Sequence, residues 1–205
     1  MTVLEWIHYG AEISYFICGG PLLLACAFLG LKQITVTKKV AADNAKREAL
    51  RIAAEWGVIY EKELIPTISK YKEETKGWRF LNDSKVTVNG NKMTANLRCI
   101  DLKNKRDLDL IEKAILVINR LESFSMHFLT GLADDEYGYI IAGHAFCSNV
   151  EFLLPVIALS VRAGDDKPTT LHLYAKWKGR LEKEKLLAEK RRIDDKLNKT
   201  FNMSV

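Results

Sequence analysis

The longest apolar run in the chain covers residues 13–31, which are 19 consecutive positions without a charged side chain. Most of it lies in the segment YFICGGPLLLACAFLGLKQ, residues 15–33. An α-helix needs about 20 apolar residues to cross the hydrocarbon core of a bilayer. The run therefore predicts a membrane-spanning helix, with residues 1–33 forming an N-terminal anchor in the lipid bilayer.

The charges on the two sides of this run differ in sign. Glu5 and Glu12 precede it, and no Lys or Arg does. Basic residues follow it at Lys32, Lys38, Lys39, Lys46, Arg47 and Arg51. A cleaved signal peptide would need a positively charged segment before the run, and basic residues mark the cytoplasmic side of a span. We expect an uncleaved anchor in the plasma (inner) membrane, with the N-terminus outside and the C-terminal domain cytoplasmic.

Small residues recur along the predicted span. They follow a four-residue spacing that only Leu22 interrupts, at Gly10, Ser14, Cys18, Cys26 and Gly30. Such a stripe lets two helix backbones approach closely, which predicts self-association of the spans. The alternative is that the stripe only reflects the high frequency of small residues in membrane helices.

Gly19, Gly20 and Pro21 lie in the middle of the span. Proline lacks a backbone donor and clashes with the preceding turn, so this segment predicts a kink. A conducting site would also need polar side chains within the membrane. Ser14 and Glu12 are the only candidates, and Glu12 falls at the expected interface. We favour a kink, and conduction would require several spans to assemble.

The apolar pattern after the span is helical. Residues 34–76 form the predicted juxtamembrane helix, with a narrow apolar seam at Ala42, Ala45, Ala49, Ile52, Trp56 and Ile59. Alternating spacings of three and four place these residues on one helix face. The seam fits either a short coiled coil that couples the domain to the span or a helix that packs on the domain. Pro66 should bend or end this helix.

Residues 77–105 depart from helical periodicity. The segment KVTVNGNKMTANL, residues 85–97, alternates apolar and polar side chains around Asn89 and Gly90. Asn-Gly between two alternating runs predicts a β-hairpin near 85–96. An irregular loop is the alternative, because two isolated strands are only marginally stable.

Residues 106–181 carry the predicted helical bundle. Asp107 is a candidate cap for a helix over 108–129, Gly131 is a candidate stop, and residues 134–136 form an acidic helix start. Residues 139–161 are the only candidate for a second span. Because His144, Asn149 and Glu151 interrupt their apolar pattern, we favour a buried helix pair.

The turn at 163–168 leads to a last helix over 171–197, with Thr169 or Thr170 as its cap. Tyr174, Trp177 and Leu181 can pack on the domain, and residues 182–205 form a charged helix and tail. Residues 171–199 hold ten Lys/Arg and five Asp/Glu, whereas the rest of the chain has 21 of each. The net charge of +5 therefore lies at the C-terminus. A solvated face fits best. Anionic lipid headgroups are the next partner to consider, and the acidic residues argue against nucleic acid.

Recognisable catalytic motifs are missing from the sequence. It contains no phosphate-binding loop, G-x-S-x-G, H-E-x-x-H or C-x-x-C. The 4 cysteines show no disulfide or zinc spacing, so we expect no metal and no cofactor.

The strongest candidates for chemistry are polar residues within apolar helices. The predicted buried polar cluster comprises Asn119, Arg120, Glu122, His127, His144, Asn149 and Glu151. Glu122 and Glu151 on facing helices would suit an acid pair or a cation site. We favour a structural network in which an arginine or backbone donors at a helix junction hold the carboxylates.

The order of elements resembles a bacterial family of uncharacterised proteins with one N-terminal transmembrane helix and a cytoplasmic helical domain of unknown function. The segments that carry the resemblance are AKREALRIAAEW, ILVINRLESFSMHFLTGLADDEY and LYAKWKGRLE. The resemblance implies that Asn119 and Glu122 belong to a core helix, that Gly131 and Leu132 form the turn after it, and that Trp177 lies in the last helix. The insertion VTVNGNKMTAN departs from that pattern. The resemblance also suggests prophage or defence cargo.

Together these patterns predict a mainly α protein in which a membrane anchor precedes a cytoplasmic helical bundle. We expect a binding, scaffold or signalling component that associates with itself or with a membrane-protein partner. One alternative is a membrane-perturbing effector whose assembled spans permeabilise the bilayer. A second alternative is an enzyme that uses the Glu/His cluster, although the sequence favours a protein without enzymatic activity.

Overall fold

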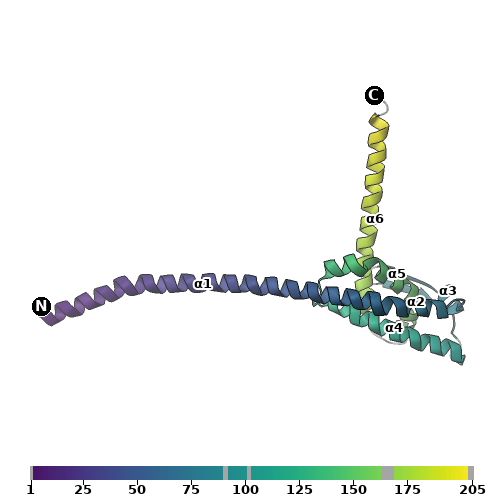
Figure 1. Cartoon of the computed structure of the whole chain (residues 1–205), viewed down its shortest axis with the longest axis horizontal. Helices are drawn as coiled ribbons and strands as arrows, with labels where there is room; N and C mark the ends of the chain where they lie inside the picture. Colours follow the sequence, from purple (N-terminus) through teal and green to yellow (C-terminus); the bar gives the residue numbers. More distant parts are fainter. Residues whose placement is uncertain (1, 90–91, 101–102, 163–168, 203–205) are drawn as a thin grey trace. The chain divides into compact units, whose positions relative to one another are not determined.

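The computed structural model of the chain describes residues 2–89, 92–100, 103–162 and 169–202. The fold is mainly α (Figure 1), and the described residues also form a small antiparallel sheet. The elements follow one another as α1 (Val3–Ile59), η1 (Tyr60–Leu64), α2 (Ile65–Glu74), α3 (Arg79–Asp83), β1 (Lys85–Asn89), β2 (Lys92–Asn96), α4 (Lys105–Leu129), α5 (Asp135–Arg162) and α6 (Thr169–Asn202). The chain divides into two units, Met1–Arg47 and Glu48–Val205.

The first unit consists of the N-terminal part of α1. Its helix continues through Gly19 and Pro21 without a break in the hydrogen-bonded pattern. Its large apolar side chains are exposed, among them Trp6, Phe16, Leu23 and Leu31. A Cβ atom added at Gly10, Gly19 or Gly30 would meet no other atom within 4 Å. The surroundings of Cys18 and Gly20 lie outside the described part of the structure, and the kink and the small-residue stripe stay predictions.

The helical run of the second unit does not end at Pro66. It passes from α1 through the π-helical turn η1 into α2 and reaches Glu74. The backbone N–H of Ile65 donates to the carbonyl of Tyr60, five residues earlier. A π turn is wider than an α turn, and here it directly precedes the proline that has no N–H to donate. The chain thus accommodates Pro66 by widening one turn.

The predicted hairpin is confirmed. Strands β1 and β2 pair antiparallel, with Val86 opposite Ala95 and Val88 opposite Met93. Val86, Val88 and Met93 are half-buried against the core, where the strands contact α5. This packing supplies the support that an isolated two-stranded sheet lacks. Gly90 and Asn91 lie outside the described residues.

The predicted boundaries of α4 need one correction. Its N-cap is Asn104, whose side chain accepts a hydrogen bond from the backbone N–H of Arg106 at 3.0 Å. Asp107 does not cap the helix and instead accepts a hydrogen bond from Trp78 Nε1 at 3.0 Å. The predicted stop is confirmed, because α4 ends at Leu129 and Gly131 has a φ of 75°. That positive φ favours glycine, which has no Cβ atom.

The core of the second unit lies among α4, α5 and α6, so a helical bundle is present as predicted. Helix α5 is one continuous helix with Pro155 inside it, not the predicted helix pair. The run Val3–Glu74 and α5 each contain an 18-residue window long and apolar enough to cross a membrane. None of the first window is buried, whereas 61% of the α5 window is buried. Burial on that scale is typical of a core helix.

The predicted juxtamembrane seam extends across both units. Ala42 and Ala45 belong to the first unit and are exposed. In the second unit, Ile52, Trp56 and Ile59 are half-buried against the core. The backbone carbonyl of Ala49 accepts a hydrogen bond from Asp134 N at 3.0 Å. This part of the seam therefore packs on the domain, as one of the two interpretations expected.

Candidate functional site

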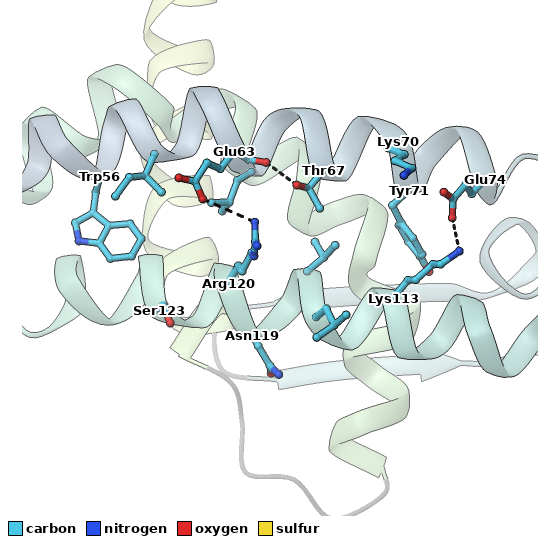
Figure 2. A pocket seen from close by; sticks show the side chains of 14 residues that line it. Trp56, Glu63, Thr67, Lys70, Tyr71, Glu74, Lys113, Asn119, Arg120 and Ser123 are labelled. Atoms are coloured by element: carbon cyan, nitrogen blue, oxygen red, sulfur yellow. Dashed lines mark hydrogen bonds and ion pairs between the residues drawn. The ribbon is translucent and has the colours of Figure 1, made fainter.

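A groove between α2 and α4, with a cavity volume of about 650 Å³, could hold a ligand or partner (Figure 2). We call it the α2–α4 groove. One wall consists of the end of α1, η1 and α2, and the other wall is α4. Ile59, Leu64 and Val117 contribute apolar lining, and Leu116 lines the groove while remaining 66% exposed. A cavity of this volume and chemistry is typical of binding sites.

Charged side chains line both walls of the groove. Lys113 Nζ lies 2.9 Å from Glu74 Oε2, and Arg120 Nη1 lies 3.9 Å from Glu63 Oε2. Figure 2 shows both ion pairs reaching from α4 to the opposite wall. Lys70 adds a further cation to the wall formed by α2. Because these side chains are partly or largely exposed, their pairs contribute little to stability and can exchange partners.

A buried tyrosine also lines the α2–α4 groove. Tyr71 is only 3% exposed, and its hydroxyl has no hydrogen-bond partner among the described residues. Its ring packs edge-on against Phe152, with 6.1 Å between the ring centroids. Burial, together with the charge of Glu74, raises the pKa of the Tyr71 phenol. Tyr71 thus remains a neutral phenol at physiological pH.

Trp56 packs against His127 beside the groove. Trp56 lines it, and the two rings lie 4.4 Å apart between centroids. His127 Nδ1 lies 2.7 Å from the carbonyl oxygen of Ser123. Since a carbonyl only accepts hydrogen bonds, Nδ1 carries the proton in this arrangement. The histidine is held by its own helix and by the Trp56 ring, which is a structural role.

Glu122 caps the N-terminus of α6. Its carboxylate accepts hydrogen bonds from Thr169 N at 2.9 Å and from Thr170 N at 3.1 Å, and the Thr169 hydroxyl donates to it as well. The predicted cap was a threonine side chain, whereas the structure uses a carboxylate from α4. A negative charge interacts favourably with the unpaired N–H groups and the dipole at a helix start. Glu122 therefore joins α4 to α6.

We expect Glu122→Ala to destabilise the second unit by about 1–2 kcal/mol, as the loss of a helix cap does. Glu122→Gln keeps one acceptor oxygen, so its loss should be smaller. Chemical denaturation of the detergent-solubilised protein, followed by circular dichroism, measures the change. Glu112→Ala, at an exposed position of the same helix, is the matched control and should change stability little. Equal effects of Glu112→Ala and Glu122→Ala would contradict the capping role.

Glu151 and Asn149 belong to two further, separate networks. Glu151 accepts a hydrogen bond from the Tyr174 hydroxyl at 3.1 Å and pairs with Lys178. Asn149 donates to the Tyr60 hydroxyl at 2.9 Å and accepts from Lys72 Nζ at 2.8 Å. Burial lowers the pKa of the Lys72 ammonium.

The predicted polar cluster is thus distributed over several places. Asn119 and Arg120 lie at the groove, His127 packs on Trp56, and the remaining members lie elsewhere on α4 and α5. Of the set only Asn149 is buried, and Asn119, Arg120, His144 and Glu151 are exposed. The prediction of a single buried cluster is wrong, because most of these residues lie at exposed positions and the others bind different partners. For Glu122 the favoured interpretation holds, since backbone donors at a helix junction bind its carboxylate. Glu122 and Glu151 bind separate partners and do not form an acid pair.

Metal chemistry finds no support in the described residues, which contain no group of three or more His, Cys, Asp or Glu side chains that could hold an ion. Cys147 is buried, and burial raises the pKa of its thiol to about 12. A thiol of that kind is a poor nucleophile. The α2–α4 groove is therefore the candidate site, and its chemistry suits binding.

Comparisons of the chain with protein-family models, with curated proteins and with solved structures gave no match. The candidate site consequently depends on the geometry of the groove alone. The sequence pattern places Trp56 and Ile59 on one seam and Arg120 in a polar cluster, and the prediction does not join the two sets. The available signal was the spacing of seven between Lys113 and Arg120, which places both cations on one face of α4.

Proposed function

We propose that this protein is a single-pass membrane protein whose helical domain acts as a binding, scaffold or signalling component and self-associates. The observation that carries the proposal is the exposure of the apolar part of α1, where none of the 18-residue window is buried. Side chains such as Leu22, Leu23 and Leu24 are 67–74% exposed. A continuous apolar surface of this kind is unfavourable in water and favourable in a bilayer.

The second unit supports the binding part of the proposal. It has a packed core of its own, and the α2–α4 groove offers apolar surface with charges along both walls. The described residues show polar networks that stabilise helix junctions and no constellation of a nucleophile, a base and an orienting group. Binding is therefore favoured over catalysis as the activity of this domain.

Charge placed in the centre of the span tests the anchor. A single Arg at the centre of a membrane helix costs about 3 kcal/mol on insertion scales, so Leu23→Arg combined with Leu24→Arg should release the protein from the membrane. The measurement is the fraction that stays with membranes after extraction at alkaline pH. The double variant Leu132→Arg and Ile140→Arg changes two exposed residues of the second unit and is the control. Unchanged membrane retention of the Leu23/Leu24 variant would contradict the anchor.

The proposed orientation has a built-in probe. Cys99 of the helical domain is exposed and free, Cys147 is buried, and Cys26, which is also exposed and free, lies within the proposed span. With the helical domain in the cytoplasm, a membrane-impermeant maleimide should label Cys99 only after the inner membrane is opened. Labelling of Cys99 in intact cells would contradict the proposed orientation and indicate that the helical domain lies outside the inner membrane.

A further inference from the structure

We propose that the exposed segment of α6 from a second copy of this chain docks in the α2–α4 groove. The proposal rests on the self-association proposed above and names the two surfaces that form the contact. Three features of the chain support it: an apolar stripe on α6, the charges beside that stripe, and the matching charges on the walls of the groove.

The apolar stripe lies on the part of α6 beyond the core. Within the part of this helix whose burial is described, which reaches residue 196, Leu181 is the last buried residue, and residues 182–196 are all exposed. Within them, Leu186 is 66% exposed and Ile193 is 51% exposed. A separation of seven residues places both on one helix face. Because this segment is exposed in the chain's own structure, it does not occupy the groove of its own copy.

The two flanks of the stripe carry opposite charges. Glu182 and Glu189 are four residues before and three residues after Leu186, which places them on one side of it. Lys183 and Lys190 are three residues before and four residues after Leu186, which places them on the other side. Each flank thus repeats one sign of charge at a spacing of seven residues, in step with Leu186 and Ile193.

The α4 wall of the groove matches the acidic flank in sign and spacing, and the opposite wall matches the basic flank in sign only, because Glu63 and Glu74 are eleven residues apart. The α4 wall presents Lys113 and Arg120, also seven residues apart, and the opposite wall presents Glu63 and Glu74. Seven helical residues span about 11 Å, so the charges of α6 and those of α4 have the same repeat length. The acidic flank of α6 would face Lys113 and Arg120, and its basic flank would face Glu63 and Glu74.

Two charges depart from this pattern. Lys70 is a cation on the otherwise acidic wall, and Asp194 is an anion on the basic flank of α6. Docking would exchange the ion pairs Lys113–Glu74 and Arg120–Glu63 for pairs between copies. Exposed ion pairs contribute little, so this exchange is nearly neutral, and burial of the apolar stripe supplies the favourable free energy. The docked helix could run in either direction along the groove. Turning it end for end moves its acidic flank from the α4 wall to the acidic wall, so the charges favour only one direction.

A photo-crosslinking side chain at Leu116 tests the docking in the full-length protein. Leu116 lines the groove and is largely exposed, so the substitution leaves the core unchanged. An equal mixture of ¹⁴N-labelled and ¹⁵N-labelled chains in mild detergent is irradiated, and cross-linked peptides are mapped by mass spectrometry. We expect mixed-label adducts within residues 183–193. Adducts that are confined to single chains, or that map to another segment, another protein or lipid, would overturn the docking.

Variants of α6 then test the apolar stripe and the charges separately. Leu186→Glu should reduce the mixed-label adduct at least tenfold. Leu187→Glu, which lies about 100° around the same helix, is the matched control and should stay within twofold. Glu182→Lys with Glu189→Lys should also reduce the adduct at least tenfold. Combining this variant with Lys113→Glu and Arg120→Glu on the crosslinker-bearing chain should restore it. A thermal melt of each variant excludes unfolding.

The outcomes separate this proposal from the proposed function. Failure of the reversed charges to restore the adduct, with membrane retention intact, overturns the docking and leaves the anchor. Loss of the protein from membranes at alkaline pH, with the adduct intact, overturns the anchor and leaves the docking.

Discussion

Trp177→Ala should strongly destabilise the second unit and move its denaturation midpoint to a much lower urea concentration. Trp177 is fully buried, and its indole ring contacts Phe128 and Phe146 at centroid distances of 5.4 and 5.1 Å. Phe124 and Tyr139 lie slightly further from the indole, at 6.0 and 6.1 Å. These rings come from both α4 and α5, so one side chain of α6 connects three helices. Truncation of a buried aromatic residue to alanine costs about 3–5 kcal/mol.

The indole nitrogen adds a polar connection to this site. Trp177 Nε1 donates to Asp135 Oδ1 at 3.0 Å, and Asp135 also pairs with Lys176 and Arg180. Asp135 begins α5, so this link holds the start of α5 to α6. The free energy of unfolding of a domain is about 5–15 kcal/mol, so loss of the indole ring removes a large part of it. Trp177→Phe should cost less, because it keeps an aromatic ring in the cavity and loses the donor.

Urea denaturation followed by circular dichroism measures both variants. Trp6→Ala, at a position 68% exposed in the first unit, is the control and should not shift the transition. A Trp177→Ala protein with an unchanged midpoint would mean that the surrounding rings do not depend on Trp177 for their packing.

Structural features that depend on a few neighbouring residues, such as turns and helix ends, could be predicted from the sequence. The hairpin at 85–96 follows from Asn-Gly between alternating runs. The end of α4 follows from Gly131, which has a φ of 75°. The start of α5 follows from its acidic residues, with Asp134 Oδ1 accepting a hydrogen bond from Tyr137 N at 2.8 Å. In each case, residues within a few positions of one another determine the local conformation.

Features that depend on contacts between distant residues could not be predicted in this way. Glu122 and Thr169 are 47 positions apart, and no local pattern indicates that one caps the helix begun by the other. Asp107 looked like a cap, but the indole of Trp78, 29 positions away, binds its carboxylate. The groove similarly requires α2 and α4 to lie side by side. The sequence shows which residues of these helices are polar, and this suggested one polar cluster. It does not show which helix face each residue occupies, because packing between the helices determines that.

The same dependence on distant contacts makes Gly138 a sharp test of the packing between α4 and α5. A Cβ atom at this position would lie 2.7 Å from Phe128 Cδ1 and 2.8 Å from Phe128 Cζ, well inside van der Waals contact. Phe128 cannot easily move away, because it is 2% exposed and packs against Phe124 and Trp177. Overpacking of a core by one such group costs about 1–3 kcal/mol.

We therefore expect Gly138→Ala to destabilise the second unit by about 1–3 kcal/mol, despite the better helix propensity of alanine. Gly179→Ala is the matched control, because it makes the same substitution within α6 where a Cβ atom would meet no other atom within 4 Å. At Gly179 the added methyl group meets no other atom, so only the higher helix propensity of alanine changes the stability. The free energy of unfolding should therefore rise by up to about 1 kcal/mol. Denaturation midpoints of the two variants should move in opposite directions. A shift of both in the stabilising direction would show that α5 can move away from Phe128, and that the close approach at Gly138 does not hold these helices together.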